Sequence, residues 1–171
     1  MTTPLAVITT YFEALESGDF ATVAAQFADD VVWHQPGDNQ FSGVHRGSEA
    51  VGAMIGGMMS VSEGTFSLRR NAPLMVNGDV VAASVHWTGK RSGAEMDGVG
   101  VDVMRVAGGK VVEVWLFTAD PAEEDAFWGA ARLEVVTLPH VCHPFGLDHD
   151  RLCAWNGNAG GRTRVRPSGT A

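Results

Sequence analysis

Apolar side chains recur at helical spacing in three stretches of the first sixty residues, and each stretch has a start or stop signal. Pro4 suits the first position of a helix, and Gly18 ends that helix. Asp19 and Ser48 can each cap a helix N-terminus. Between the second and third helices, a short apolar run closed by Pro36 predicts a strand that is followed by a loop. The predicted helices cover residues 4–17, 20–29 and 48–60, and the strand covers residues 31–35.

From Thr65 onward the pattern changes to an alternation of apolar and polar residues, which is typical of half-buried strands. The turns at residues 91–93 and 108–109 are short enough for hairpins, so we expect sequential antiparallel strands. Asp120-Pro121 opens a last short helix. Together these elements predict an α+β fold, in which the three N-terminal helices cover one face of a strongly curved sheet. The predicted strands cover residues 65–71, 74–90, 95–107 and 110–118, and the second is interrupted at residues 77–79.

Regular patterning stops shortly after Gly129. Val135–Leu138 has the composition of a short strand, but several prolines and the glycine-rich stretch 157–161 leave little room for regular structure around it. We therefore expect one domain over residues 1–130 and an irregular C-terminal extension over residues 131–171.

Composition and charge exclude several classes of protein. The net charge is −8, and residues 1–130 carry 17 acidic against seven basic side chains, so this part of the chain repels phosphate backbones. No window approaches the roughly 18 consecutive apolar residues of a membrane span, and the N-terminus lacks the basic and apolar regions of a signal peptide. We expect a cytoplasmic protein that binds neither nucleic acid nor membrane.

The predicted extension holds both cysteines, Cys142 and Cys153, so the predicted domain depends on no disulfide. It also holds His140, His143 and His149, but the spacing of these five residues matches no closed four-ligand zinc motif. The domain has no glycine-rich phosphate loop, no Gly-x-Ser-x-Gly elbow and no nucleophilic Cys–His arrangement. We predict neither a metal site nor covalent catalysis.

Three sequence segments, in order along the chain, resemble those of a known family. They are residues 11–19 (Tyr-Phe-Glu-Ala-Leu-Glu-Ser-Gly-Asp), residues 27–34 (Phe-Ala-Asp-Asp-Val-Val-Trp-His) and residues 109–115 (Gly-Lys-Val-Val-Glu-Val-Trp). Residues 4–128 thereby resemble the SnoaL-like polyketide-cyclase and ketosteroid-isomerase branch of the nuclear-transport-factor-2-like superfamily. The resemblance implies a cone-shaped α+β barrel with an apolar pocket in its open end, in a protein that is usually a homodimer.

Asp102 and Tyr11 are the leading catalytic candidates. Asp102 interrupts a strand that is otherwise apolar on both faces, where an unpaired charge is costly. The resemblance to ketosteroid isomerases implies a protonated acid at the position of Asp102 and an oxyanion-hole tyrosine at the position of Tyr11. The alternatives are a cross-strand arginine or histidine partner for Asp102 and an ordinary core role for Tyr11.

The bases that the resemblance implies are missing from their usual positions. Gln35 stands where the isomerases have a carboxylate, and an amide cannot take a proton at neutral pH. Leu116 stands where the cyclases have an acid. Gly100 stands where limonene-type epoxide hydrolases have an arginine, which argues against epoxide hydrolysis by that mechanism.

Two histidines could replace the missing base. His34 neighbours Gln35 but points to the other face of its strand, unless a bulge re-aims it. His86 lies within cross-strand reach of Asp102 if the hairpin turns near residues 92–95, although a slip of one residue would put it on the opposite face. An ordinary structural or surface role is the alternative for both.

The leading hypothesis is a cofactor-free isomerase or cyclase that acts by acid–base chemistry on an apolar, steroid-like or polyketide-like carbonyl compound. Asp102 and Tyr11 would polarise the carbonyl oxygen, and one of the two histidines would move the proton. The rival hypothesis is a non-catalytic ligand-binding or dimerisation module of the same fold. The predicted substrate-binding residues are Trp33, Gln35, Met58, Met104 and Leu116.

Overall fold

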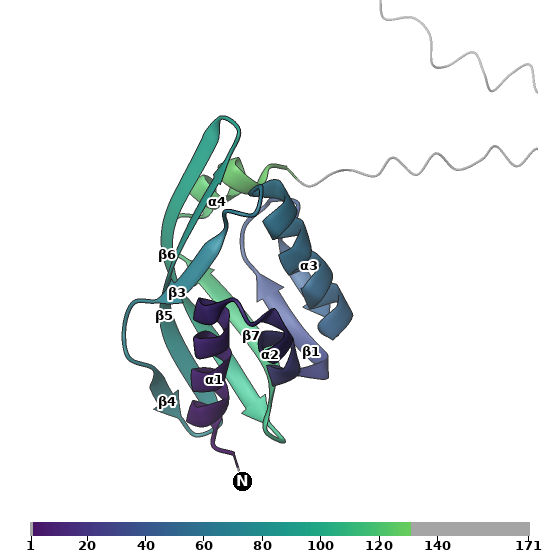
Figure 1. Cartoon of the computed structure of the whole chain (residues 1–171), viewed down its shortest axis with the longest axis vertical. Helices are drawn as coiled ribbons and strands as arrows, with labels where there is room; N and C mark the ends of the chain where they lie inside the picture. Colours follow the sequence, from purple (N-terminus) through teal and green to yellow (C-terminus); the bar gives the residue numbers. More distant parts are fainter. Residues whose placement is uncertain (1, 131–171) are drawn as a thin grey trace, which may run out of the picture. The chain divides into compact units, whose positions relative to one another are not determined.

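The computed structural model describes residues 2–130, which form four helices and a seven-stranded sheet (Figure 1). The helices are α1 (Pro4–Ser17), α2 (Phe20–Gln26), α3 (Ser48–Val61) and α4 (Pro121–Trp128). The strands are β1 (Phe27–Gln35), β2 (Gly43–Arg46), β3 (Ser67–Arg70), β4 (Met75–Asn77), β5 (Val80–Arg91), β6 (Ala94–Ala107) and β7 (Lys110–Thr118). The possible strand at residues 135–138 and the predicted extension lie outside the described residues.

The strands form one curled sheet that does not close on itself within the described part of the chain. Their order is β2-β1-β7-β6-β5-β3, and β4 also pairs with β5. All pairs are antiparallel except that of β1 with β7. Helices α1 and α3 lie over the same side of the sheet, and α4 lies near one end of the molecule (Figure 1). The predicted α+β fold, with helices on one face of a curved and largely antiparallel sheet, is therefore confirmed.

Capping groups place the ends of the first two helices. The Thr3 hydroxyl accepts a hydrogen bond from the Ala6 backbone N–H at 3.2 Å. Gly18 ends α1 with a φ of 75°, a conformation that favours glycine. Asp19 accepts a hydrogen bond from the Thr22 backbone N–H at 3.1 Å, and so it caps α2 as predicted.

Three details between residues 20 and 60 differ from the prediction. Helix α2 ends at Gln26 and not near residue 29, because Phe27 already belongs to β1 and pairs with Val111. Residues 43–46, which were expected in a loop, form β2 and pair with the end of β1. Ser48 is the first residue of α3 and not its cap. The first two differences arise from strand pairing, which local sequence does not reveal.

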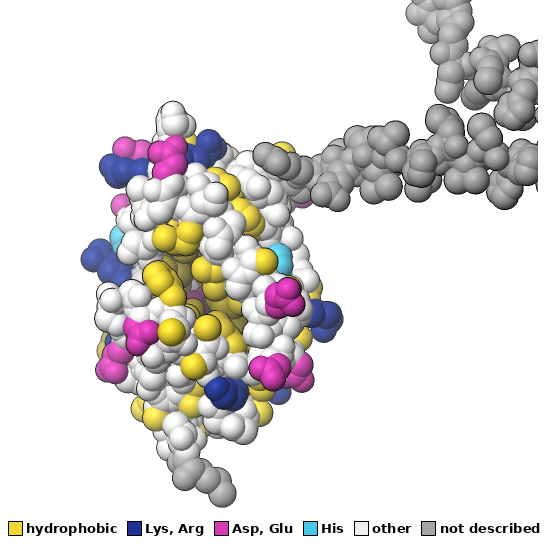
Figure 2. All heavy atoms as spheres, turned by 45° about the vertical axis from the view of Figure 1, so that its right-hand side comes forward, with side chains coloured by type: hydrophobic (Ala, Val, Ile, Leu, Met, Phe, Trp, Pro, Cys, Tyr) yellow, Lys and Arg dark blue, Asp and Glu magenta, His cyan; other side chains and the backbone are white. Residues whose placement is uncertain are grey.

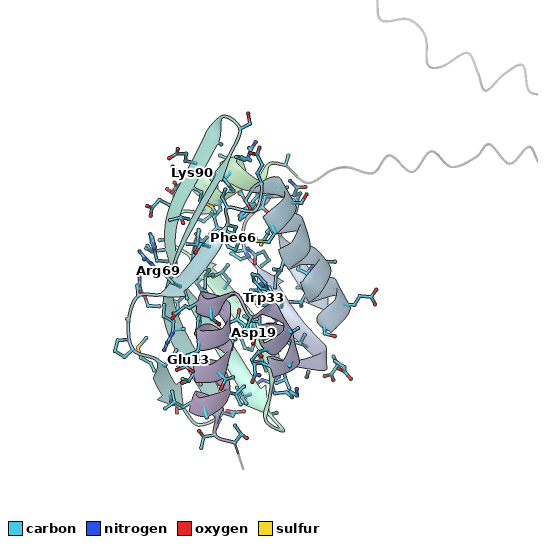
Figure 3. All side chains as sticks on the ribbon, in the orientation of Figure 1. Glu13, Asp19, Trp33, Phe66, Arg69 and Lys90 are labelled. Carbon is cyan, nitrogen blue, oxygen red and sulfur yellow. The ribbon has the colours of Figure 1, made fainter. Side chains whose placement is uncertain are left out.

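The hydrophobic core lies between α1, α3 and the covered face of the sheet. Ile8 of α1 and Met54 of α3 are buried there, and α4 adds Phe127 at one end. Trp33 and Phe66 lie in the interior, whereas charged side chains such as Arg69 and Lys90 lie on the periphery (Figure 3). None of the helices in residues 2–130 is long and apolar enough to cross a membrane.

Two glycines of β6 make room for a tryptophan of β5. Gly98 is paired with Trp87, and a Cβ atom at Gly98 would lie only 2.4 Å from Trp87 Nε1. A Cβ atom at Gly100 would lie 2.2 Å from the backbone oxygen of Phe117 and 2.6 Å from the same indole ring. The indole therefore packs directly on bare backbone, which only glycine permits at these two positions.

We expect Gly100→Ala to destabilise the domain by about 1–3 kcal/mol, because the new methyl group meets both an indole ring and a backbone oxygen. Gly52→Ala is the matched control: it lies on the exposed side of α3, and its Cβ atom would have no neighbour within 4 Å. The control should stabilise the protein by up to about 1 kcal/mol, since alanine is the better helix former. Urea unfolding measures both effects, and equal stability of Gly100→Ala and wild type would contradict the tight contact.

Candidate functional site

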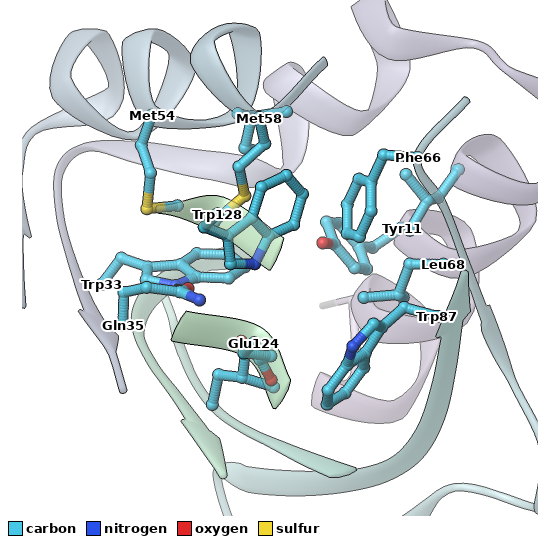
Figure 4. Close-up of a pocket in the computed structure, with 13 residues that line it drawn as sticks. Tyr11, Trp33, Gln35, Met54, Met58, Phe66, Leu68, Trp87, Glu124 and Trp128 are labelled. Carbon is cyan, nitrogen blue, oxygen red and sulfur yellow. Dashed lines mark hydrogen bonds between the residues drawn. The ribbon is translucent and has the colours of Figure 1, made fainter. Parts of the chain in front are cut away.

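A cavity opens between α1, α3, α4 and the covered face of the sheet (Figure 4). The cavity volume is about 70 Å³, and all the empty space, open solvent included, is about 550 Å³. The cavity volume is smaller than the roughly 150 Å³ of an engineered cavity that binds benzene, so a larger ligand has to extend toward solvent. Figure 2 shows a hollow with hydrophobic walls on this side of the molecule.

Aromatic rings make up much of the cavity wall, and they come from elements far apart in the sequence. Trp128 of α4 packs edge to face on Phe66, with 5.3 Å between the ring centres. Flat apolar surfaces of this kind suit a planar ligand. We call this space the aromatic cavity; its rings belong to Tyr11, Trp33, Phe66, Trp87 and Trp128.

Gln35 lies in the wall beside Trp33, because alternate residues of β1 face the same side of the sheet. The Trp33 indole N–H donates a hydrogen bond to the Gln35 side-chain oxygen at 2.9 Å. This bond occupies the amide oxygen, so the group that Gln35 can offer to a ligand is its NH₂ donor. At this position the site therefore has a hydrogen-bond donor and not a base.

Tyr11 projects from α1 into the cavity, and its hydroxyl points toward the centre (Figure 4). Its ring is held by edge-to-face contacts with Phe12 and Phe27, at 5.0 and 5.7 Å between ring centres. Burial, and then the negative charge of Asp102, raise the pKa of Tyr11 well above its ordinary value. The phenol therefore stays neutral and serves as a donor.

Asp102 lies in the buried part of β6 with no polar partner. Its side chain is 0% exposed, and neither carboxyl oxygen has a hydrogen-bond partner among the described residues. Burial, and then the charge of Glu124, raise the pKa of Asp102 from 3.8 to about 7. No arginine or histidine of residues 2–130 pairs with Asp102, so the alternative of a cross-strand ion pair is wrong. Asp102 does not line the cavity but lies behind its wall, between Ala83 and Leu116 of the neighbouring strands.

Glu124 is the carboxylate of the cavity wall, and the sequence analysis missed it. Its side chain is only 3% exposed, and its Oε1 atom has no hydrogen-bond partner among the described residues. Burial raises the pKa of Glu124. A signal was present in the sequence: Glu124 precedes Phe127 and Trp128 by three and four residues, which places an acid on the apolar face of a short helix.

The predicted approach of His86 to Asp102 is wrong. His86 pairs with Val99, whereas Asp102 pairs with Ala83, three residues away along β5. Because side chains alternate between the faces of a strand, His86 lies on the outer face of the sheet while Asp102 lies on the inner face. Its Nε2 atom lies 2.7 Å from the exposed carboxylate of Asp97. The structure therefore places His86 outside the aromatic cavity.

His34 also faces away from the cavity. Strand β1 keeps its alternation through this region, with Trp33 and Gln35 inward and His34 outward, so no bulge re-aims the imidazole. Its ring is stacked on Trp115 at 5.2 Å, and its Nε2 atom lies 2.9 Å from Glu113 Oε1. Neither histidine that was considered as a base reaches the site.

Four of the five predicted substrate-binding residues line the aromatic cavity; they are Trp33, Gln35, Met58 and Leu116. The placement of Met104 in the cavity wall is wrong. Met104 is 1% exposed and lies deeper in the core, between Val81 and Val114 on the two neighbouring strands. It shares the inner face of β6 with Asp102 but lies two residues farther from the cavity.

Metal ligands do not gather in the part of the chain that the structure describes. Residues 2–130 contain no group of three or more His, Cys, Asp or Glu side chains that could hold a metal ion. The histidines and cysteines of the predicted extension lie outside these residues.

Comparison with known proteins places this geometry in context. Residues 8–114 match the SnoaL-like domain family. An uncharacterized protein of Mycobacterium tuberculosis is 32% identical over 117 residues, which are 68% of this chain and 89% of that protein.

Solved structures share the fold. A Xanthomonas campestris protein of unknown function with a cystatin-like fold is 46% identical, with a TM-score of 0.71 over 74% of this chain and 98% of that chain. A putative polyketide cyclase of Pseudomonas putida is 19% identical, with a TM-score of 0.54 over 68% of this chain and 92% of that chain. The second likeness shows a common fold alone.

The buried carboxyl of Asp102 should make stability depend on pH. The folded protein binds this proton more tightly than the unfolded chain, so the contribution of Asp102 to the free energy of unfolding is complete below about pH 4 and is lost as the pH rises through about 7. A shift from 3.8 to about 7 corresponds to a loss on the order of 4 kcal/mol across this window. Asp102→Asn should remove this part of the slope and be the more stable protein at pH 8.

Urea unfolding between pH 4.5 and 8.5 measures both proteins. Asp29→Asn, which changes an exposed acid of β1, is the control and should follow the wild-type curve. Parallel curves for wild type and Asp102→Asn would show that Asp102 is not a buried neutral acid.

Proposed function

The chain belongs to the SnoaL-like domain family, and we propose that it binds a planar, apolar carbonyl compound, steroid-like or polyketide-like, and isomerises or cyclises it by acid–base chemistry without a cofactor. One observation carries the proposal: an apolar cavity holds a neutral tyrosine donor beside two buried carboxyl groups, and no basic residue in the described part of the chain pairs with them. Asp102 has no hydrogen-bond partner among the described residues, and Glu124 has only the uncharged side chains of Thr118 and Trp128. Burying carboxyl groups without a cationic partner is costly, and this cost is typical of sites where the groups act on a ligand.

The proposed ligand follows from the cavity wall. Aromatic rings line most of it, and its polar side-chain groups are few: the hydroxyl of Tyr11, the amide of Gln35, the carboxyl of Glu124 and the indole N–H groups of the tryptophans, of which Trp87 Nε1 has no hydrogen-bond partner among the described residues. The hydroxyl, amide and indole groups are donors, which suits a ligand with a carbonyl oxygen and a large apolar body. Negatively charged ligands fit poorly, because an ionised Glu124 would repel them.

The proposed chemistry is enolisation. A proton leaves the carbon next to the carbonyl group, and the negative charge that develops on the carbonyl oxygen is stabilised by the hydrogen bond from Tyr11. Asp102 lies behind the cavity wall and does not touch the ligand space; kept protonated, it adds no negative charge near the place where the enolate forms. Such chemistry needs only positioned donors and a base.

A second candidate function has its own support. Gln35 and Leu116 stand in the cavity wall where the resemblance implies carboxylates, and this favours a binding protein that kept the cavity and lost the catalytic base. Such a protein would bind the same class of ligand without exchanging its protons.

Replacing Tyr11 by Phe should separate binding from chemistry. We expect the variant to bind a cyclic ketone as well as wild type does and to exchange the protons next to the carbonyl about 100-fold more slowly, since it lacks the oxyanion donor. Proton NMR in D₂O with a panel of steroid and aromatic ketones measures the exchange rate. Thr10→Val removes an exposed hydroxyl from the same helix and should change neither quantity. Ketone binding without any exchange by wild type would favour the second candidate function.

We also propose that two copies of the chain pair through the outer face of β6 and β7. Val101 and Phe117 are cross-strand partners that point outward. Phe117 is 57% exposed, and Val99, which lies next to them, is 46% exposed. An apolar patch on an otherwise acidic surface suits a self-complementary contact between identical subunits.

Phe117→Glu should convert the dimer into a monomer, because it places two like charges in the contact. Light scattering after size-exclusion chromatography measures the mass in solution. Met75→Glu is the control, since Met75 is an equally exposed apolar residue on β4, away from this patch. A wild-type protein that is monomeric at high concentration would contradict the proposed contact.

A further inference from the structure

Glu124 lies in the wall between two hollows. On one side is the aromatic cavity. On the other side is a crevice of about 110 Å³, lined by the acids Asp97, Asp120 and Glu123 and by Ala119. We call it the acidic crevice. Glu124 and Trp87 line both spaces, so Glu124 forms part of the partition between the ligand side and the solvent side.

We propose that Glu124 is the base that takes the substrate proton and returns it, and that the acidic crevice connects this base to water. The inference rests on the proposed function and adds the group that the proposed chemistry lacks. It assigns the proton transfer to a residue of α4, and none of the residues that the sequence analysis considered as a base lies on that helix.

Position selects Glu124 among the acids and bases of the described chain. It is the one carboxylate among the cavity-lining residues of this region, and Tyr11 is the other ionisable group there. His34 and His86 lie on the outer face of the sheet, and Gln35 cannot accept a proton. A base has to lie within reach of the proton that it removes, and in this cavity only Glu124 meets that condition.

The charge of Glu124 acts on Asp102. It raises the pKa of Asp102, so an ionised Glu124 favours the protonated form of Asp102. Asp102 is sealed behind the wall, whereas Glu124 lines two hollows. With Glu124 ionised as the base, Asp102 is therefore favoured as the neutral acid, and Glu124 is the carboxylate that borders the ligand space.

The step balances without a further reactant. The Glu124 carboxylate removes a proton from the carbon next to the carbonyl; the C–H electron pair becomes the C=C bond of the enolate, and the former C=O π pair moves onto oxygen, which accepts the hydrogen bond from Tyr11. In a β,γ-unsaturated ketone this enolate is a dienolate. The carboxylic acid then returns the proton to the γ-carbon, which takes the former β,γ π pair, while the enolate C=C pair becomes the α,β double bond and the oxygen pair re-forms the C=O bond. Nothing is oxidised or reduced. A proton that leaves through the acidic crevice before it is returned is replaced by one from water.

Glu124→Gln tests the base, and an exposed glutamate of α1 supplies the matched control. With a β,γ-unsaturated cyclic ketone as the probe, we expect Glu124→Gln to slow isomerisation at least 100-fold while changing ketone affinity less than threefold. Glu13→Gln makes the same substitution at an exposed position that lines neither the aromatic cavity nor the acidic crevice, and it should keep wild-type rates. The wild-type rate should fall at low pH as Glu124 gains a proton, and this limb should be missing from the residual activity of Glu124→Gln.

The outcomes separate this inference from the proposed function. If Tyr11→Phe is slow and Glu124→Gln is as fast as wild type, Glu124 is not the base and the proposed function stands. If wild type neither binds nor isomerises the ketone, both are overturned. Circular dichroism confirms that each variant is folded, and Glu124→Asp should recover part of the rate because it keeps the carboxylate.

Ala119→Leu tests the crevice, because Ala119 is an exposed residue of its lining. Filling the crevice should slow exchange of the captured proton with solvent. In D₂O, the product made by Ala119→Leu should therefore carry at least twofold less deuterium per turnover than the wild-type product. An unchanged deuterium content would show that the proton reaches water by another route.

Discussion

The site depends on keeping one carboxyl group, that of Asp102, away from both water and cations. No basic side chain among residues 2–130 offsets it, so the folded chain accommodates it best as the neutral acid. The two neighbouring polar groups are linked to this carboxyl group. Burial keeps the Tyr11 phenol protonated and a negative charge on Asp102 would raise its pKa further, while the charge of Glu124 opposes ionisation of Asp102. The stability of the fold, the protonation states of the site and its response to a ligand are therefore linked through the same carboxyl group.

Local pattern was enough to predict most of the fold. The long alternating runs became β5, β6 and β7 close to their predicted ends, because alternation with glycine turns has few other solutions. Helix α1 was equally clear, since both of its ends carry a chemical signal. The short elements around residue 27 and at residues 43–46 were not predicted correctly, because strand pairing forms them: Phe27 pairs with the distant Val111, and residues 43–46 pair with the end of β1.

The site was only partly accessible from sequence, for a geometric reason. Tyr11, Trp33 and Gln35 could be placed because helical and strand periodicities say which face each residue occupies. The pairing of His86 required the exact hairpin register, and the actual register puts it beside Asp97 on the outer face. Glu124 was missed because a helix of eight residues gives little periodicity, and only the packing of α4 shows that its apolar side closes the cavity.

The parallel pairing of β1 with β7 has a consequence for how the protein is made. It joins side chains 79 positions apart, such as His34 and Glu113, so β1 has no neighbour on that side until nearly the whole domain has left the ribosome. During most of translation, the first helices and Trp33, which is buried in the folded domain, therefore lack their final partners on β7. Pairing of β1 with β7 is then a late event, and α4, the last of the described elements to be synthesised, completes the wall of the aromatic cavity.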